Sequence, residues 1–291
     1  MKVSVPLHVS GFWIPYYEPN PYLTGSVGAG IILNPPLRAE LVGDKALING
    51  REANLPHLST ILQVTGGSRA GARIKTPAGL GEGFGVSAAV SLAFSLSSLH
   101  SRDYGPRLEE AGLYAHYAEV MHLTGLGDVI AELRGGDIVV RVKPGAPGIG
   151  KAYSIKIRGS RIAAITGQFR NYTTPQMLRE LAPRIRRCGN SALSKFMRNE
   201  SIHSFLEAST DFSLCTGMLT HTLLNELKGQ LKPYIRRGSV LGFFVKKGLL
   251  LIMAEKNVSQ ELVEQVRALK SLRPSGVNIF RVGGKGVEVT E

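Results

Sequence analysis

One glycine-rich stretch constrains this chain more than any other segment. Thr76–Phe94 reads TPAGLGEGFGVSAAVSLAF, and glycine stands at every second position from Gly79 to Gly85. Alternating glycines free the backbone to turn its N–H groups towards one point. The apolar run from Val86 to Leu99 contains no proline or glycine, which predicts a buried helix. Unpaired N–H groups and the positive end of the helix dipole would coincide where this helix begins, so we interpret the loop as a nucleotide phosphate site. A flexible linker before a core helix is the alternative.

The overall composition favours a globular protein with an anionic partner. The chain has 291 residues, enough for one large or two modest domains, and 43% of them are hydrophobic. A net charge of +13 favours nucleotides, phosphates, carboxylates or nucleic acid and does not choose among them. Nucleic-acid binding therefore stays an alternative, although no basic and aromatic recognition motif is visible.

The cysteines and the N-terminus indicate a reducing compartment. Cys188 and Cys215 are isolated in the sequence, so we expect two buried thiols and no zinc site. The N-terminus lacks the apolar core of a signal peptide, and no apolar run reaches the roughly 18 residues that a membrane span needs. We therefore expect a cytoplasmic protein with no membrane partner.

The first half of the chain alternates predicted strands and helices. A strand is expected over 2–9, and a hairpin over 37–49 with its turn at Gly43-Asp44. The intervening segment 11–30 carries three prolines and five aromatic residues, which predicts an irregular loop. Such a loop either lines a site or packs over the core edge. The remaining helices are predicted at 56–64, 86–99 and 107–123, and the strands at 72–75, 137–142 and 152–158.

The second half begins with a block of predicted helices instead of alternating strands and helices. Helices are predicted at 175–187, 192–206, 214–231 and 259–272, and strands at 240–245, 249–254 and 277–282. Two strands, a helix and a strand after a helical block suggest a small α+β sandwich.

The glycine loop resembles the phosphate loop of the GHMP small-molecule kinases. That family's pattern is proline, three residues, then Gly-Leu-Gly-Ser-Ser-Ala, and residues 83–88 (GFGVSA) occupy its last six places. The chain departs from the pattern at Val86, which replaces the first serine, and at Gly79, which replaces the proline. Further ordered blocks over roughly the first 180 residues resemble the archaeal pantoate kinases within that family: VPLHVSGFW, TGSVGAGI, AHYAEV with TGLGDV, and the pair of Arg141 with PGAPG at 144–148.

This resemblance implies a fold, a reaction and a set of ligands. The fold would be α+β of the GHMP-kinase type, with an N-terminal α/β ATP-binding domain over 1–165 and a C-terminal ferredoxin-like sandwich over 166–291. The reaction would transfer the γ-phosphoryl group of ATP to pantoate, with Mg²⁺ as cofactor. Homoserine, mevalonate or shikimate remain alternative acceptors, and a homodimer is an open alternative for the assembly.

Phosphoryl transfer needs bound phosphates, Mg²⁺ and help in deprotonating the acceptor. Ser87 could contact phosphate or Mg²⁺, or simply cap the helix. Glu119 lies on an otherwise apolar predicted helix, so we assign it to Mg²⁺, with a surface glutamate as the alternative. Asp128 in TGLGD would act as general base or orient the acceptor hydroxyl, unless it only caps the next element. The predicted nucleotide contacts are Gly79, Gly81, Gly83, Phe84, Gly85, Val86, Ser87 and Ala88.

The acceptor would be held by four residues. Arg141 suits its carboxylate, because guanidinium binds carboxylates bidentately. Ser26, His116 and Thr174 match polar positions of the resembled family near the acceptor, although neighbouring Thr173 could replace Thr174. A histidine on an apolar helix is otherwise typical of a satisfied core residue.

Overall fold

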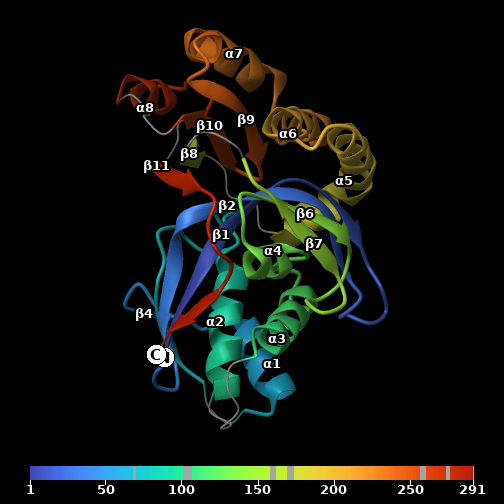
Figure 1. Cartoon of the computed structure of the whole chain (residues 1–291), viewed down its shortest axis with the longest axis vertical. Coiled ribbons are helices and arrows are strands. Elements are labelled where there is room, and N and C mark those ends of the chain that lie inside the picture. The colour runs from blue at the N-terminus through green and yellow to red at the C-terminus, as the bar shows by residue number, and fades with distance from the viewer. Residues whose placement is uncertain are drawn as a thin grey trace.

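Two long antiparallel strands, β1 (Lys2–Tyr16) and β2 (Gly25–Glu40), form the spine of the molecule (Figure 1). The computed structural model describes residues 1–67, 70–100, 107–157, 162–168, 174–255, 260–272 and 276–290. Strand β2 also pairs with β5 (Ala72–Lys75), β6 (Ile138–Lys143) and β11 (Gly276–Val282), so most of the sheet converges on it.

The prediction of an irregular aromatic loop over 11–30 is wrong. Strand β1 continues through Pro15 to residue 16, and β2 begins at residue 25. Eleven consecutive residues of β1, from 5 to 15, are buried, so the strand carries apolar side chains on both faces and lacks the alternation that marks a half-exposed strand. Phe12 and Trp13 belong to the core, with ring centroids 5.6 Å from Phe196 and 4.7 Å from Phe212 respectively.

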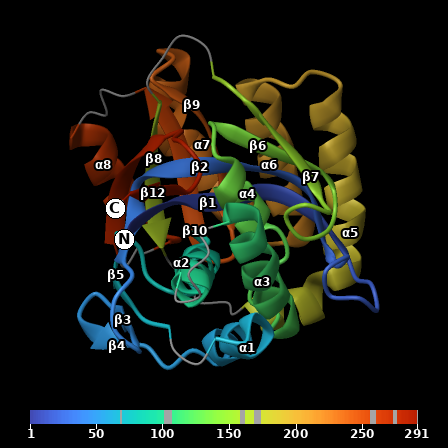
Figure 2. The same cartoon turned by 60° about the horizontal axis from the view of Figure 1, so that its bottom comes forward.

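The helices α1 (Pro56–Thr65), α2 (Val86–His100) and α3 (Leu108–Met121) lie together on one side of β1 and β2 (Figures 1 and 2). All three confirm the predicted helices, as β6 and β7 (Lys151–Ile155) confirm the strands that follow. The short α4 (Asp128–Arg134) begins at the aspartate of the TGLGD turn.

The predicted 37–49 hairpin is wrong. Strand β5 lies between β2 and β3 (Ala46–Ile48), with β4 (Arg51–Glu52) outside them.

The second half builds a ferredoxin-like layer. Its strands β8 (Ile162–Gln168), β9 (Val240–Lys246), β10 (Leu249–Glu255) and β11 stand in the order β11-β8-β10-β9, and all their pairings are antiparallel. Helices precede β9 and β11, as a β-α-β-β-α-β pattern requires. They are α5 (Thr174–Met197), α6 (Ile202–Thr216), α7 (His221–Arg236) and α8 (Gln260–Arg267). The predicted α+β class and ferredoxin-like sandwich are confirmed, whereas the domain boundary at residue 165 stays a prediction. A last strand, β12 (Glu288–Thr290), pairs with β1 and brings the two termini together.

Two expectations about α5 and α6 are corrected. The predicted break near residue 190 does not exist, because α5 runs through Gly189, where a Cβ would overlap the Trp13 carbonyl oxygen. Glycine there lets the helix pack directly on β1. Cys188 and Cys215 are not free thiols but a disulfide between α5 and α6. Their separation of 27 residues forms no local motif, so only the packing of two helices reveals the pair. Among the described helices, none is long and apolar enough to cross a membrane.

Candidate active site

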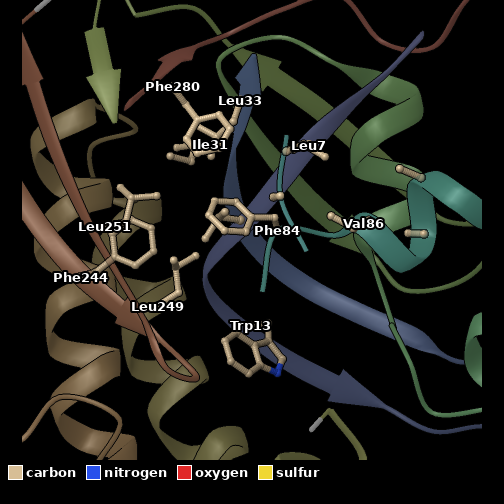
Figure 3. Close-up of a cluster of buried hydrophobic side chains, with 14 of the residues drawn as sticks. Leu7, Trp13, Ile31, Leu33, Phe84, Val86, Phe244, Leu249, Leu251 and Phe280 are labelled. Atoms are coloured by element: carbon tan, nitrogen blue, oxygen red, sulfur yellow. The ribbon is translucent and has the colours of Figure 1, made fainter. Parts of the chain in front are cut away.

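The glycine loop leads directly into α2 and is anchored to the core. Gly81, Gly83 and Gly85 have φ angles of 79°, 98° and 74°, a region that residues with a Cβ rarely adopt. Between them, Phe84 points into the core, where its ring centroid lies 5.2 Å from that of Phe280 (Figure 3). Its carbonyl oxygen accepts a hydrogen bond of 3.0 Å from the His8 backbone N–H. The loop is thus anchored on one side and open on the other.

A single pocket brings this loop together with residues from distant parts of the chain. It is lined by the loop and the start of α2, the turn before α4 and the tip of the β9–β10 hairpin, together with individual residues of β1, β2, α3 and α5. The side chains and backbone that line it include Ser10, Trp13, Ser26, Gly81, Gly83, Gly85, Val86, Ser87, Ala88, Glu119, Thr124, Gly125, Leu126, Gly127, Asp128, Met177, Lys246 and Lys247. Most of the predicted nucleotide contacts are among them.

Glu119 lines the pocket next to Ser87. It is 1% exposed, and its Oε1 accepts hydrogen bonds from the Ser87 hydroxyl at 2.5 Å and the Ser91 hydroxyl at 3.0 Å. Burial raises the pKa of this carboxyl to about 7, although those hydrogen bonds oppose the rise. The alternative of a surface glutamate is therefore wrong.

Asp128 faces the pocket from the first residue of α4. Its Oδ1 lies 2.7 Å from His8 Nδ1 and 3.7 Å from Lys246 Nζ. Burial alone would raise the pKa of this carboxyl, but Lys246, His8 and Arg141 outweigh it and hold the pKa well below its ordinary range. The lowered pKa keeps Asp128 ionised near neutral pH, which suits it to orienting a donor more than to storing a proton.

Arg141 acts on Asp128 through His8. Its Nη1 lies 3.3 Å from His8 Nε2, so that nitrogen accepts and the ring proton sits on Nδ1, where it is donated to Asp128. Burial lowers the pKa of His8 to about 4 even though Asp128 opposes this, which keeps the ring neutral. Arg141 itself is 1% exposed and lies behind the pocket wall, where a Cβ on Gly127 would come 2.7 Å from its Nε.

The other predicted residues divide into those at the pocket and those that support it. Ser26 lines the pocket, whereas the buried His116 donates a hydrogen bond of 2.8 Å from Nε2 to the Thr24 carbonyl oxygen. Burial lowers the pKa of His116 to about 4, so the ring is neutral and fixes the start of β2. Thr174 is the first residue of α5, while its side chain and all of Thr173 lie outside the described residues.

Two predicted nucleotide contacts do not line the pocket. The Gly79 N–H donates to the Glu82 carboxylate at 2.7 Å, and Phe84 is a core residue.

The sequence did not single out His8, Trp13, Lys246 or Lys247 as residues of this site. His8 and Trp13 lay inside a block that resembles the family, but nothing in the sequence paired them with the TGLGD turn. Lys246 and Lys247 come from the second half, where the resemblance is diffuse. The adjacent lysines following a buried strand were the only available signal.

No family model matches this chain. A pantoate kinase from Thermococcus kodakarensis is 24% identical over 278 residues, which cover 89% of this chain and 90% of that protein. A pantoate kinase from Methanospirillum hungatei is 31% identical over 156 residues, which cover 49% of this chain and 53% of that protein. The predicted resemblance to archaeal pantoate kinases is confirmed.

Solved structures confirm the fold. A phosphotransferase related to the CoA biosynthesis pathway superposes with a TM-score of 0.77 at 21% identity, over 99% of this chain and 98% of that one. The homoserine kinase of Cytophaga hutchinsonii superposes with a TM-score of 0.65 at 16% identity, over 100% of this chain and 97% of that one. The chain has the GHMP-kinase fold.

Proposed function

We propose that this chain is an ATP-dependent pantoate kinase, which transfers the γ-phosphoryl group of ATP to the primary hydroxyl of pantoate. One observation carries the proposal. The Lys246 ammonium group lies 3.2 Å from the Gly83 carbonyl oxygen and 3.7 Å from Asp128 Oδ1. The glycine loop and the ionised Asp128 carboxylate therefore lie on opposite sides of the Lys246 side chain, which contacts both. The similarity to the Thermococcus pantoate kinase over almost its whole length supports pantoate as the acceptor.

The loop and the N-terminus of α2 form the ATP side of the pocket. Positive φ angles at alternating glycines let successive backbone N–H groups converge, and the helix dipole adds positive potential at Val86. Because these donors belong to the backbone, they need no reorganisation when the phosphates arrive.

Ser87 and Glu119 fit a Mg²⁺ ion that accompanies ATP. A hydroxyl and a carboxylate, 2.5 Å apart at the edge of the phosphate loop, are oxygen ligands of the kind that Mg²⁺ prefers. Within the described ranges, no group of three or more histidine, cysteine or acidic side chains could hold a metal. The remaining ligands of such an ion would come from phosphate and water. Bound Mg²⁺ would neutralise charge on the phosphates, and Glu119, with its pKa near 7, would lose its proton to solvent on binding the ion.

Asp128, Ser26 and the residues behind them form the acceptor side. Asp128 accepts the hydroxyl proton or holds the hydroxyl in line with the phosphorus. The loose transition state of phosphoryl transfer requires little basicity from Asp128, which agrees with the lowered pKa of this carboxyl. We assign the carboxylate of pantoate to the side of the pocket formed by Ser26, backed by the positive charge of Arg141. His116 positions that side through Thr24.

The test is an ADP-release assay with purified protein, Mg-ATP and each of pantoate, homoserine, mevalonate and shikimate. We expect turnover with pantoate and a phosphorylated product that phosphorus NMR identifies as a primary phosphate ester. If pantoate releases no more ADP than a reaction without acceptor, the proposed acceptor is wrong.

A further inference from the structure

The tip of the β9–β10 hairpin places two lysines in the pocket. Lys246 ends β9 and pairs with Leu249 of β10, and Lys247 occupies the turn between them with φ 57°. Each lysine is only 7% exposed, and both line the pocket. Lysine is almost never buried unless charge nearby compensates it. Two adjacent buried lysines therefore indicate a place where negative charge is received.

The hairpin is fixed against both the phosphate loop and α6. A Cβ built on Gly83 would lie in van der Waals contact, 3.7 Å from the Leu249 side chain. Figure 3 shows Leu249 beside Phe84, the anchor of the loop. On the other side, Ser213 of α6 exchanges two hydrogen bonds with the backbone of Val245, of 2.8 and 3.1 Å. Lys246 follows directly, so its Cα position is set before any ligand binds.

Electrostatics at the tip favour an anion. Burial and the neighbouring Lys246 lower the pKa of Lys247 to about 8, although Asp128 and Glu119 oppose the shift. Burial also lowers the pKa of Lys246, against the attraction of Asp128. A phosphoryl oxygen beside these groups would relieve both the loss of solvation and their mutual repulsion.

We propose that Lys246 is a catalytic residue that binds the γ-phosphoryl group during transfer, with Lys247 as a second cation at the same group. This inference rests on the proposed kinase function. Lys246 already touches the loop carbonyl and approaches Asp128, so a phosphoryl group between them lies within its reach. As the bond from the γ-phosphorus to its bridging oxygen breaks and the bond to the acceptor oxygen forms, ADP leaves with the electron pair. The hydroxyl proton passes to Asp128 or solvent, and both lysines keep their protons.

Nucleotide binding tests this without any acceptor. Trp13 lines the pocket and is the only tryptophan of the chain, so its fluorescence can follow titration with ADP and with a non-hydrolysable ATP analogue. Lys246→Met should weaken the analogue by about 10- to 150-fold, the range for a lost hydrogen bond to a charged group, and change ADP binding less than about threefold. Lys228→Met, at an exposed lysine of α7, is the matched control and should change neither.

The turnover number separates a catalytic from a structural role. With pantoate, Lys246→Met should lower kcat by about 10²- to 10³-fold, the effect of losing one transition-state donor. Equal weakening of ADP and the ATP analogue would show that Lys246 only supports the loop through Gly83, which overturns the proposal. Unchanged binding and kcat would overturn it as well. Wild-type protein that binds both nucleotides but does not phosphorylate pantoate would refute the proposed acceptor alone.

A wild-type measurement covers the case in which the variant does not fold. Amine acylation followed by mass spectrometry should label Lys247 and Lys246 in the free protein. The ATP analogue should protect them at least about tenfold more than ADP, since only the analogue carries the γ-phosphoryl group. Equal protection by both nucleotides would contradict the proposal.

Discussion

Replacing Glu119 by glutamine should stabilise the protein at alkaline pH while it removes activity. Burial raises the pKa of Glu119 from its ordinary 4.5 to about 7, and the side chain is 1% exposed. A raised carboxyl pKa means that the folded state holds a proton that the unfolded state releases. The contribution of Glu119 to stability is therefore complete below pH 4.5 and is partly lost as pH rises to about 7.

The magnitude follows from that difference. At about 1.4 kcal/mol per pKa unit, ionising Glu119 in the folded protein costs about 3 kcal/mol. Glutamine cannot ionise, and its amide oxygen can still accept the hydrogen bonds from Ser87 and Ser91. The free energy of unfolding of Glu119→Gln relative to wild type should therefore rise by about 2–3 kcal/mol between pH 5 and pH 8.

Urea denaturation at both pH values measures this, without Mg²⁺ or nucleotide. Glu109→Gln changes an exposed residue of the same helix and is the matched control. In the ADP-release assay, Glu119→Gln should lower kcat strongly at every pH, because the carboxylate proposed for Mg²⁺ is gone. A stability difference from wild type that is the same at pH 5 and pH 8 would refute the reasoning.

Three further predictions address other parts of the molecule. Asp128→Asn should lower kcat by about 10²- to 10⁴-fold and leave nucleotide affinity intact; fluorescence titration and kinetics with pantoate check this, and wild-type turnover would remove the assigned role. Gly85→Ala should be far more damaging than Gly81→Ala, because both have positive φ but only the Cβ at Gly85 would overlap a neighbouring side chain; similar melting temperatures and ATP affinities for the two would contradict this. Cys188→Ser should lower the free energy of unfolding by about 3–4 kcal/mol, since the bond to Cys215 closes a loop of 27 residues; a thiol titration that finds two free cysteines without denaturant would refute the disulfide.

The sequence predicted those parts of the fold that leave a periodic signal. The run from Val86 to Leu99 reads as a buried helix, and α2 spans Val86–His100. The two strands, helix and strand of the second half predicted a small α+β sandwich, and the family resemblance implied its ferredoxin-like form; β8 was not predicted. The predicted strand ended at residue 9, too early, because β1 is buried on both faces and contains Pro15. Neither alternation nor turn residues mark where the strand ends. The break expected in α5 failed because Gly189 serves helix–strand contact instead of chain reversal.

The residues of the candidate site also differ in how far the sequence alone could identify them. Ser87, Glu119 and Asp128 lie in local motifs, and the structure brings all three to one pocket. The roles of His8 and Lys246 depend on contacts with Asp128 and Gly83, which lie 120 and 163 residues away in the sequence. A single sequence holds no record of such pairs. Arg141 could be identified as a cation for a carboxylate, but not as one that lies behind the wall and acts through His8.

The relay from Arg141 through His8 explains why an ionised aspartate can serve this pocket. A lone carboxylate at a site that binds polyphosphate would repel its ligand and, once buried, would take up a proton. Here a neutral His8 donates to Asp128, and the charges of Arg141 and Lys246 outweigh the effect of burial on its pKa. The carboxylate keeps its charge and a fixed orientation, so the acceptor hydroxyl can be aligned before transfer begins.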